Sequence, residues 1–413
     1  MTMMEEMGQR AKEASQVVAQ LTTKQKNDAL LKMAMALRAG QATILAANEA
    51  DLASAKEMPA KFVDRLRLTP QRIDDMATGL ETVANLDDPV AKIDRGWVNY
   101  AGLEIIQRRV PLGVVGIIFE ARPNVTADAT ALTFKSGNAV ILRGGKEAAR
   151  SNQAIVACLQ AALTESGLSK DAVQLVEDQS HAVATEMMHL TGYIDVLIPR
   201  GGKGLIARVL ETATVPVIET GAGNCHIYID QSADLAVAAP IVVNAKVQRP
   251  SVCNAAEKLL VNQAVAEEQL PSLVAALREH GVEVRGDERA RAIVSDLVPA
   301  TDADWDTEYN DLIMAVKVVD DLDEAIQWIN QHSTHHSEAI ITKDMERGRA
   351  FQQRVDSACV YVNASTRFTD GSEFGFGAEI GISTQKLHAR GPMGLAQLTT
   401  IKYQITGDGQ IRQ

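Results

Sequence analysis

The run RVPLGVVGIIFEARPNVT, Arg109–Thr126, indicates the fold of this chain. Its apolar centre, Val114–Phe119, is short and bounded by turn residues, which is typical of a buried strand. A helical stretch, 127–134, follows it. The alternation repeats downstream, with strands expected at 139–142, 172–176, 195–198 and 215–218 and a long helix at 147–166. Short apolar strands separated by helices predict a parallel, doubly wound α/β sheet.

Further regions flank this sheet in the sequence. Residues 1 to about 95 carry apolar side chains at helical spacing and predict helices that cover a sheet. The segment 97–109 alternates between apolar and polar residues, which predicts β structure. A second α/β unit is expected after Gly223. Its strands are predicted at 226–229, 258–261, 282–284, 313–319 and 339–341, with a helix at 322–331.

The composition limits the classes of function. The chain has 413 residues, enough for two or three domains, with 46% hydrophobic and 23% charged residues, which are ordinary globular values. Its net charge is −12 without a basic tract, which argues against a nucleic-acid surface. An anionic small molecule remains open as a substrate, because it needs only a local basic pocket.

The chain start and the cysteines bear on location and on metals. The first residues are acidic, so no signal peptide is expected, and no apolar run approaches the length that spans a bilayer. The cysteines lack C-x-x-C spacing, so we expect neither a zinc site nor a disulfide framework, and a reducing cytoplasm follows. The segment 332–336, with His332, His335 and His336, is interpreted as a polar loop, and no metal site is predicted.

Two glycine-rich turns follow predicted strands. Gly202–Ala207 fits G-x-G-x-x-A, which suits either phosphate binding at a helix N-terminus or merely a tight βα turn. In the first case Glu219 would hold a ribose. The turn Arg143–Lys146 sets two cations beside two glycines, which suits an anionic ligand, although solvated turn charges are nearly as good an interpretation.

Cys253 lies in the run QRPSVCN, Gln248–Asn254, between a polar turn and an apolar segment. With Lys246 and Arg249 upstream, its thiol could be a nucleophile, because cationic neighbours favour the reactive thiolate. A lone cysteine is more often a small buried apolar residue. The run by itself leaves both interpretations open.

Five sequence runs span almost the whole chain. They are Arg109–Thr126, IPRGG at 198–202, QRPSVCN at 248–254, VNASTRFTDG at 362–371 and STQKLHARGPMG at 383–394. Taken together, in this order, they resemble the aldehyde dehydrogenase superfamily, and within it the branch that reduces acyl phosphates. The resemblance implies an α/β fold of the aldehyde dehydrogenase type, with two doubly wound α/β domains and a β-flap with a tail.

The resemblance also implies a division into domains. A cofactor-binding domain of Rossmann type is expected from residues 1–96 and 111–221, with a return segment at about 367–395. A catalytic domain is expected at 222–366. The flap and tail, 97–110 and 396–413, are expected to join subunits into a dimer or tetramer.

Three catalytic residues are implied by position. Cys253 matches the family nucleophile, and Asn124 matches the side-chain amide that binds the developing oxyanion together with the Cys253 N–H. Glu219 matches the general base that activates water in hydrolytic relatives. A reductase must keep water from its thioester, so Glu219 is expected to position the cofactor or the thiol instead.

The cofactor implied is NADPH. Many NAD-preferring relatives have Lys-Pro-x-Glu where this chain has Arg143–Lys146, so a ribose-binding carboxylate is replaced by a cation that can pair with a 2′-phosphate. Glu308 roughly matches the family glutamate near the nicotinamide ribose. The cofactor-binding residues implied are Arg143, Gly144, Lys146, Arg200, Gly201, Gly202 and Glu308.

The reaction implied is the reduction of L-glutamyl 5-phosphate to L-glutamate 5-semialdehyde and phosphate through a thioester, in proline biosynthesis. A separate glutamate 5-kinase is a possible partner. An acylating enzyme that uses a coenzyme A thioester and a non-catalytic NADP-binding scaffold remain alternatives. The candidates for binding the substrate anions are Arg122, Lys246, Arg249, Arg367 and Arg390.

Overall fold

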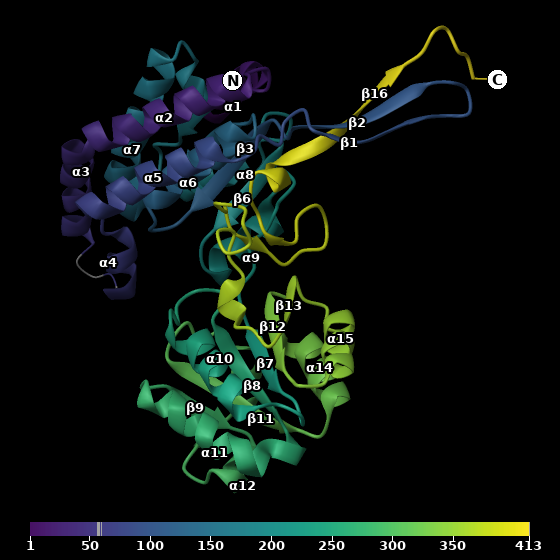
Figure 1. Cartoon of the computed structure of the whole chain (residues 1–413). Coiled ribbons are helices and arrows are strands. Elements are labelled where there is room, and N and C mark those ends of the chain that lie inside the picture. Colours follow the sequence, from purple (N-terminus) through teal and green to yellow (C-terminus); the bar gives the residue numbers. More distant parts are fainter. Residues whose placement is uncertain (56–57, 59, 413) are drawn as a thin grey trace. The chain divides into compact units, whose positions relative to one another are not determined.

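The computed structural model describes residues 1–55, 58 and 60–412, which form two compact units (Figure 1). Unit 1 contains Met1–Thr220, Gly375–Gly381 and Met393–Gln413, and unit 2 contains Gly221–Phe374 and Ile382–Pro392. The expected return segment is therefore divided, because residues 367–374 and 382–392 belong to unit 2. The roles expected for the domains stay predictions.

Unit 1 is built on a four-stranded parallel sheet with the order β5-β4-β3-β6. Its strands are β3 Val114–Phe119, β4 Ala139–Arg143, β5 Val173–Leu175 and β6 Val196–Arg200, as the sequence predicts. The strand expected at 215–218 is wrong, since the structure has there only an isolated bridge between Leu197 and Val217. Pro216 lacks an N–H, and it can accept but not donate in a ladder.

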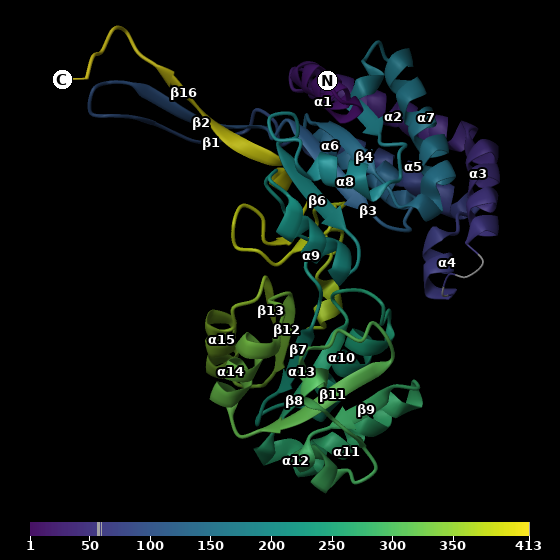
Figure 2. The ribbon, with the colours of Figure 1, turned by 180° about the vertical axis from the view of Figure 1, so that it is seen from behind.

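Helices flank the sheet of unit 1 (Figure 1, Figure 2). Thr2 and Thr22 form capping boxes, which fix the starts of the first two helices. None of the helices in the described part of the chain is long and apolar enough to cross a membrane. The helices are α1 Met3–Val18, α2 Thr23–Ala39, α3 Gln41–Ser54, α4 Ala60–Leu66, α5 Pro70–Asn85, α6 Asn124–Lys135, α7 Ala149–Glu165, α8 His181–Met188 and α9 Lys203–Thr212.

An antiparallel sheet in the order β1-β2-β16 extends from the α/β part of unit 1 (Figure 1). Its strands are β1 Ile93–Val98, β2 Glu104–Pro111 and β16 Thr399–Thr406. The turn between β1 and β2 is held by Asn99, whose Oδ1 accepts from the N–H groups of Ala101 and Leu103, both at 2.9 Å. Large apolar side chains of this sheet are exposed, namely Ile93, Trp97, Val98, Ile401, Tyr403 and Ile405.

Unit 2 is built on a seven-stranded parallel sheet with the order β10-β9-β11-β8-β7-β12-β13. The strands are β7 Cys225–Ile229, β8 Ala256–Asn262, β9 Glu283–Gly286, β10 Val298–Pro299, β11 Ile313–Val319, β12 Ser337–Ile341 and β13 Cys359–Val362. The helices are α10 Leu235–Val247, α11 Gln263–Glu279, α12 Glu288–Ile293, α13 Asp302–Asp306, α14 Leu322–His332 and α15 Met345–Arg354. A short antiparallel pair, β14 Ile382–Ser383 and β15 Gly391–Pro392, completes it. All five strands predicted for this unit are confirmed.

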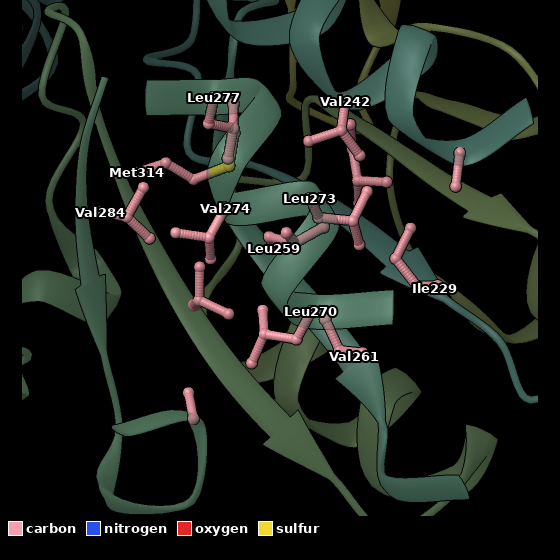
Figure 3. Packing of buried hydrophobic residues seen from close by; sticks show 14 of the residues in the cluster. Ile229, Val242, Leu259, Val261, Leu270, Leu273, Val274, Leu277, Val284 and Met314 are labelled. Atoms are coloured by element: carbon pink, nitrogen blue, oxygen red, sulfur yellow. The ribbon is translucent and has the colours of Figure 1, made fainter. Parts of the chain in front are cut away.

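The central strands β7, β8 and β12 of unit 2 are buried on both faces. Leu259 and Val261 of β8 join one core cluster with α10 and α11, which Figure 3 shows from close by. Leu260, between them, joins a second cluster with α14 and α15 on the other face. This alternation follows from the two-residue period of a strand, and burial on both faces explains the continuous apolar runs in the sequence.

Leu259→Ala is expected to lower the free energy of unfolding of unit 2 by about 3 kcal/mol, because its fully buried side chain leaves a cavity that neighbours fill only in part. Leu387→Ala is the control, since that side chain is 82% exposed. Urea titration of both variants measures the difference. Equal stability of the two variants would contradict the packing described above.

Candidate active site

In unit 1, predicted site residues gather where the strands of the sheet end. Asn124 lies five residues after β3, the turn Arg143–Lys146 begins at the last residue of β4, and Arg200–Gly202 begins at the last residue of β6. Because the strands are parallel, their carboxyl ends share one edge of the sheet, which is where open α/β sheets bind ligands.

The turn after β4 concentrates positive charge. Arg143 is half-buried, and one of its guanidinium nitrogens, Nη2, donates to the Gln179 carbonyl at 2.9 Å. Burial lowers the pKa of Arg143, the Glu147 carboxylate opposes the shift, and Arg208 on α9 adds charge repulsion. Arg208 was not predicted as a site residue, because 65 residues separate it from Arg143 in the sequence. Lys146 is exposed at the start of the following helical turn.

The turn after β6 is closed by a carboxylate. The Gly202 N–H donates to Glu120 Oε2 at 2.8 Å, and a side chain at position 201 would collide with the same carboxylate. Gly202 is also the residue that precedes α9, so the expected G-x-G-x-x-A turn does open a helix. Glu120, which the sequence analysis did not single out, thus accepts the hydrogen bond of the Gly202 N–H.

Glu219 is half-buried and lies at the end of the first segment of unit 1.

Asn124 is oriented by a neighbour on its own helix. Its amide nitrogen Nδ2 donates to Asp128 Oδ2 at 2.9 Å, one turn along α6. Burial raises the pKa of Asp128 to about 6, although the Asn124 hydrogen bond and the charge of Arg200 oppose the shift. The helix was predicted only at 127–134, whereas α6 begins at Asn124, so the four-residue spacing of this pair on one helix was not apparent from the sequence.

In unit 2, predicted site residues lie at the opposite ends of the strands. Cys253 lies in the turn before β8, and Glu308 lies before β11. Gly223 lies just before β7. These strands are adjacent and parallel, in the order β11-β8-β7, so their amino ends share one edge.

The backbone of Gly223 lies against the carbonyl group of Cys253. Any side chain at position 223 would overlap that carbonyl, so only glycine fits there. The N–H of Gly223 donates to Glu308 Oε1 at 2.8 Å. Gly223 therefore links the expected nucleophile to the expected cofactor-binding glutamate. The sequence indicated only a glycine-rich turn.

Two other groups are buried behind Cys253. The Cys225 thiol donates to the Cys253 carbonyl at 3.2 Å, and burial raises the pKa of that thiol well above its usual value. His336 Nδ1 lies 3.8 Å from Cys225 Sγ, and burial lowers the pKa of His336 to about 4. The polar loop predicted at 332–336 is therefore wrong for His336, whose side chain enters the interior just before β12.

Two of the candidate cations lie at the turn that carries Cys253. Arg367 is half-buried, and its guanidinium donates to Asn254 Oδ1 and to Gln248 Oε1, the latter at 2.9 Å. Burial lowers the pKa of Arg367, and the nearby charge of Arg249 lowers it further. Two cations held this close together favour an anionic ligand.

The other candidate cations differ in their surroundings. Lys246 is fully buried and forms an ion pair with Glu257 at 2.8 Å, so the prediction that it binds substrate is corrected. Arg390 pairs with Asp356 at 3.0 Å. Arg122 belongs to unit 1, where it lies just before α6.

This chain resembles known proteins over almost its whole length. The model of the Aldehyde dehydrogenase family matches residues 2–304 and 290–403 of the chain. The chain belongs to the aldehyde dehydrogenase family. This confirms the predicted family and its fold.

Relatives within the family show which of its branches this chain resembles. The chain is 70% identical over 410 residues to a gamma-glutamyl phosphate reductase of Lacticaseibacillus casei, covering 99% of this chain and 98% of the relative. It is 67% identical over 407 residues to that of Limosilactobacillus reuteri, with 98% of each covered. The crystal structure of the Thermotoga maritima enzyme of this name matches with a TM-score of 0.98 at 50% identity, over 100% of both chains. The chain therefore groups with the gamma-glutamyl phosphate reductases of the family.

Gly223→Ala is expected to displace the turn that carries Cys253, because the added methyl group overlaps the Cys253 carbonyl. The rate of alkylation of Cys253 by iodoacetamide, followed by mass spectrometry, should change by about tenfold or more. Gly204→Ala is the control, since a Cβ there meets no atom within 4 Å. An unchanged alkylation rate in Gly223→Ala would show that the close approach does not fix the thiol.

Asp128→Asn is expected to change how stability depends on pH. The native carboxyl, with its pKa raised to about 6, binds a proton more tightly than the unfolded chain, so this group's contribution falls as pH rises from about 4 to 6. The variant lacks that fall. Urea unfolding at pH 4.5 and pH 7 should show a smaller loss of stability in Asp128→Asn than in the wild type, and Asp408→Asn, an exposed position, serves as control. Identical pH profiles would contradict the raised pKa.

Proposed function

We propose that the chain catalyses the reduction of L-glutamyl 5-phosphate to L-glutamate 5-semialdehyde and phosphate, the second step of proline biosynthesis from glutamate. The observation that carries this proposal is the 67–70% identity to gamma-glutamyl phosphate reductases over 98–99% of the chain. The geometry supports it, because Cys253 follows Arg249 in one turn of unit 2, and the Arg367 guanidinium bonds to Asn254 of the same turn. That arrangement suits a substrate with an acyl carbon beside a phosphate.

Cys253 is the proposed nucleophile. Its thiolate attacks the C5 acyl carbon, a C–S bond forms, and the C–O bond to phosphate breaks with its electron pair leaving on phosphate. Arg249 and Arg367 attract the phosphoryl group before the attack and stabilise the phosphate that leaves. The product of this half-reaction is a thioester on Cys253. Asn124 and the Cys253 N–H are proposed to hold the oxyanion.

A nicotinamide cofactor is the reductant of this family, and NADPH is the form that we propose. When bound, it supplies the hydride that converts the thioester to the aldehyde. Arg143, Lys146 and Arg208 fit a 2′-phosphate, because they place positive charge at one end of the unit 1 sheet. Glu308 is proposed to bind the nicotinamide ribose. Glu219 is proposed to position cofactor or thiol.

A homo-oligomer is proposed from the β1-β2-β16 sheet. Exposed Ile, Val, Trp and Tyr side chains on an antiparallel sheet are costly in water and favour burial against a second copy of the chain. Whether this gives a dimer or a tetramer stays a prediction, as does association with a separate glutamate 5-kinase. The cytoplasmic location also stays a prediction.

Cys253→Ser is expected to reduce turnover by a factor of about 10³ or more while NADPH still binds, because the hydroxyl is a far weaker nucleophile. The assay is phosphate-dependent reduction of NADP⁺ by glutamate 5-semialdehyde, with NADPH binding followed by fluorescence. Cys158→Ser, in α7, is the matched control and should keep its activity. Normal turnover in Cys253→Ser would refute the thioester route. Release of coenzyme A in place of phosphate would indicate an acylating dehydrogenase.

Lys146→Glu is expected to shift the cofactor preference from NADPH towards NADH by about tenfold or more. The reason is that one lost charge-assisted hydrogen bond costs about 1.5–3 kcal/mol and the new carboxylate repels a 2′-phosphate. The measurement is the ratio of kcat/KM with the two cofactors. Lys343→Glu, on an exposed loop of unit 2, is the control. A wild-type ratio that favours NADH would contradict the proposed cofactor.

A further inference from the structure

The loop 307–311, just before β11, carries Glu308 and is held by buried charges. It has a positive φ of 54° at Asn310, a conformation that side chains seldom adopt. The carboxylate of Glu308 lies against the Gly223 N–H, and Gly223 lies against Cys253. The position of this loop therefore decides where a carboxylate stands beside the nucleophile.

An ion pair holds the loop from one face of the sheet. Lys246 of α10 and Glu257 of β8 are both fully buried and lie 2.8 Å apart. Lys246 also donates to the Asp311 carbonyl at 3.1 Å, and Glu257 Oε1 accepts from the Asn310 N–H at 3.2 Å. The positive φ of Asn310 is thus stabilised by a buried carboxylate.

A second lysine holds the loop from the other face. Lys258 follows Glu257 in β8, so its side chain points to the opposite side of the sheet. It is fully buried, donates to the Thr307 carbonyl at 2.7 Å and lies 4.5 Å from the centre of the Tyr309 ring. Burial lowers the pKa of Lys258 to about 7. We call these three residues, Lys246, Glu257 and Lys258, the charged triad.

Burying three ionisable groups is costly, and their mutual attraction seldom compensates in full. A buried network of this kind is better explained as fixing one backbone conformation than as stabilising the fold. All three side chains direct their polar atoms to one another or to the backbone of one loop of five residues.

We infer that the charged triad is a positioning device that fixes the 307–311 loop and thereby holds the Glu308 carboxylate at the Gly223 N–H beside Cys253. Its kinetic consequence rests on the proposed function, in which Glu308 binds the cofactor. Its structural consequence does not, because the contacts that hold the loop all come from residues of the chain itself.

The first test uses the full chain without substrate. Hydrogen exchange, followed by mass spectrometry, reports the amides of Asn310 and Gly223. Glu257→Gln is expected to speed exchange at both amides by about tenfold, although Glu257 accepts from the Asn310 N–H and the Gly223 N–H donates to Glu308 instead. The double variant Lys246→Met/Glu257→Leu removes the pair without leaving a buried charge unpaired, and the same result is expected there.

Asp230→Asn is the matched control. Asp230 is as deeply buried as Glu257 and pairs with Arg347, but it follows β7 at the opposite end of the same sheet. The Asp230→Asn variant should show faster amide exchange near Arg347 and an unchanged rate of exchange at Gly223. Unchanged exchange at Gly223 in both triad variants, or an equal rise in the control, would overturn the inference.

The second test is kinetic. Glu257→Gln is expected to raise the KM for NADPH by about tenfold with a smaller effect on kcat, and to have little effect in a Glu308→Gln background. Equal effects in both backgrounds would overturn the inference. If the wild type shows no reductase activity, the proposed function fails, and the exchange experiment still decides whether the triad positions the loop.

Discussion

The burial of β8 on both faces and along both edges is the constraint on which unit 2 depends. Its neighbours β7 and β11 supply the edges, and the two core clusters supply the faces. Because the strand cannot shift, the turn before it is also fixed, and that turn carries Cys253. The close approach of Gly223 to the Cys253 carbonyl then joins β7 to the same point. A rigid sheet edge, rather than a mobile loop, positions the thiol.

The strands were predictable because parallel sheets impose simple patterns. Apolar runs such as Val114–Phe119 and 258–261 admit few interpretations once helices separate them. The strand expected at 215–218 failed because apolar content outweighed one proline, although Pro216 cannot donate to a ladder. The division of the segment 367–395 between units could not be read locally. It depends on contacts with residues far away in the sequence.

The site was predictable in part, for a similar reason. Arg143 and Arg200 each end a strand, and open α/β sheets bind ligands at the carboxyl ends of their strands, so both could be proposed from the sequence. Cys253 precedes its strand, and no local rule favours an amino end, so the resemblance had to supply it. Lys246 was misjudged because a cation near a nucleophile suggests a ligand, whereas its partner Glu257 lies eleven residues away on another element. The proximity of Arg208 to Arg143 was missed for the same reason.

The two units solve the problem of placing charge in different ways. Unit 1 places the half-buried Arg143 at the carboxyl end of β4 with Arg208 nearby, and we propose that both charges attract an anion. Unit 2 instead buries a lysine on each face of β8 and pairs one of them, Lys246, with Glu257. Buried charge of this kind cannot bind a ligand, but it can restrict a backbone, because each polar atom must keep its partner. We therefore propose that the cations near the candidate sites divide between recognition and positioning, and that full burial separates the two roles.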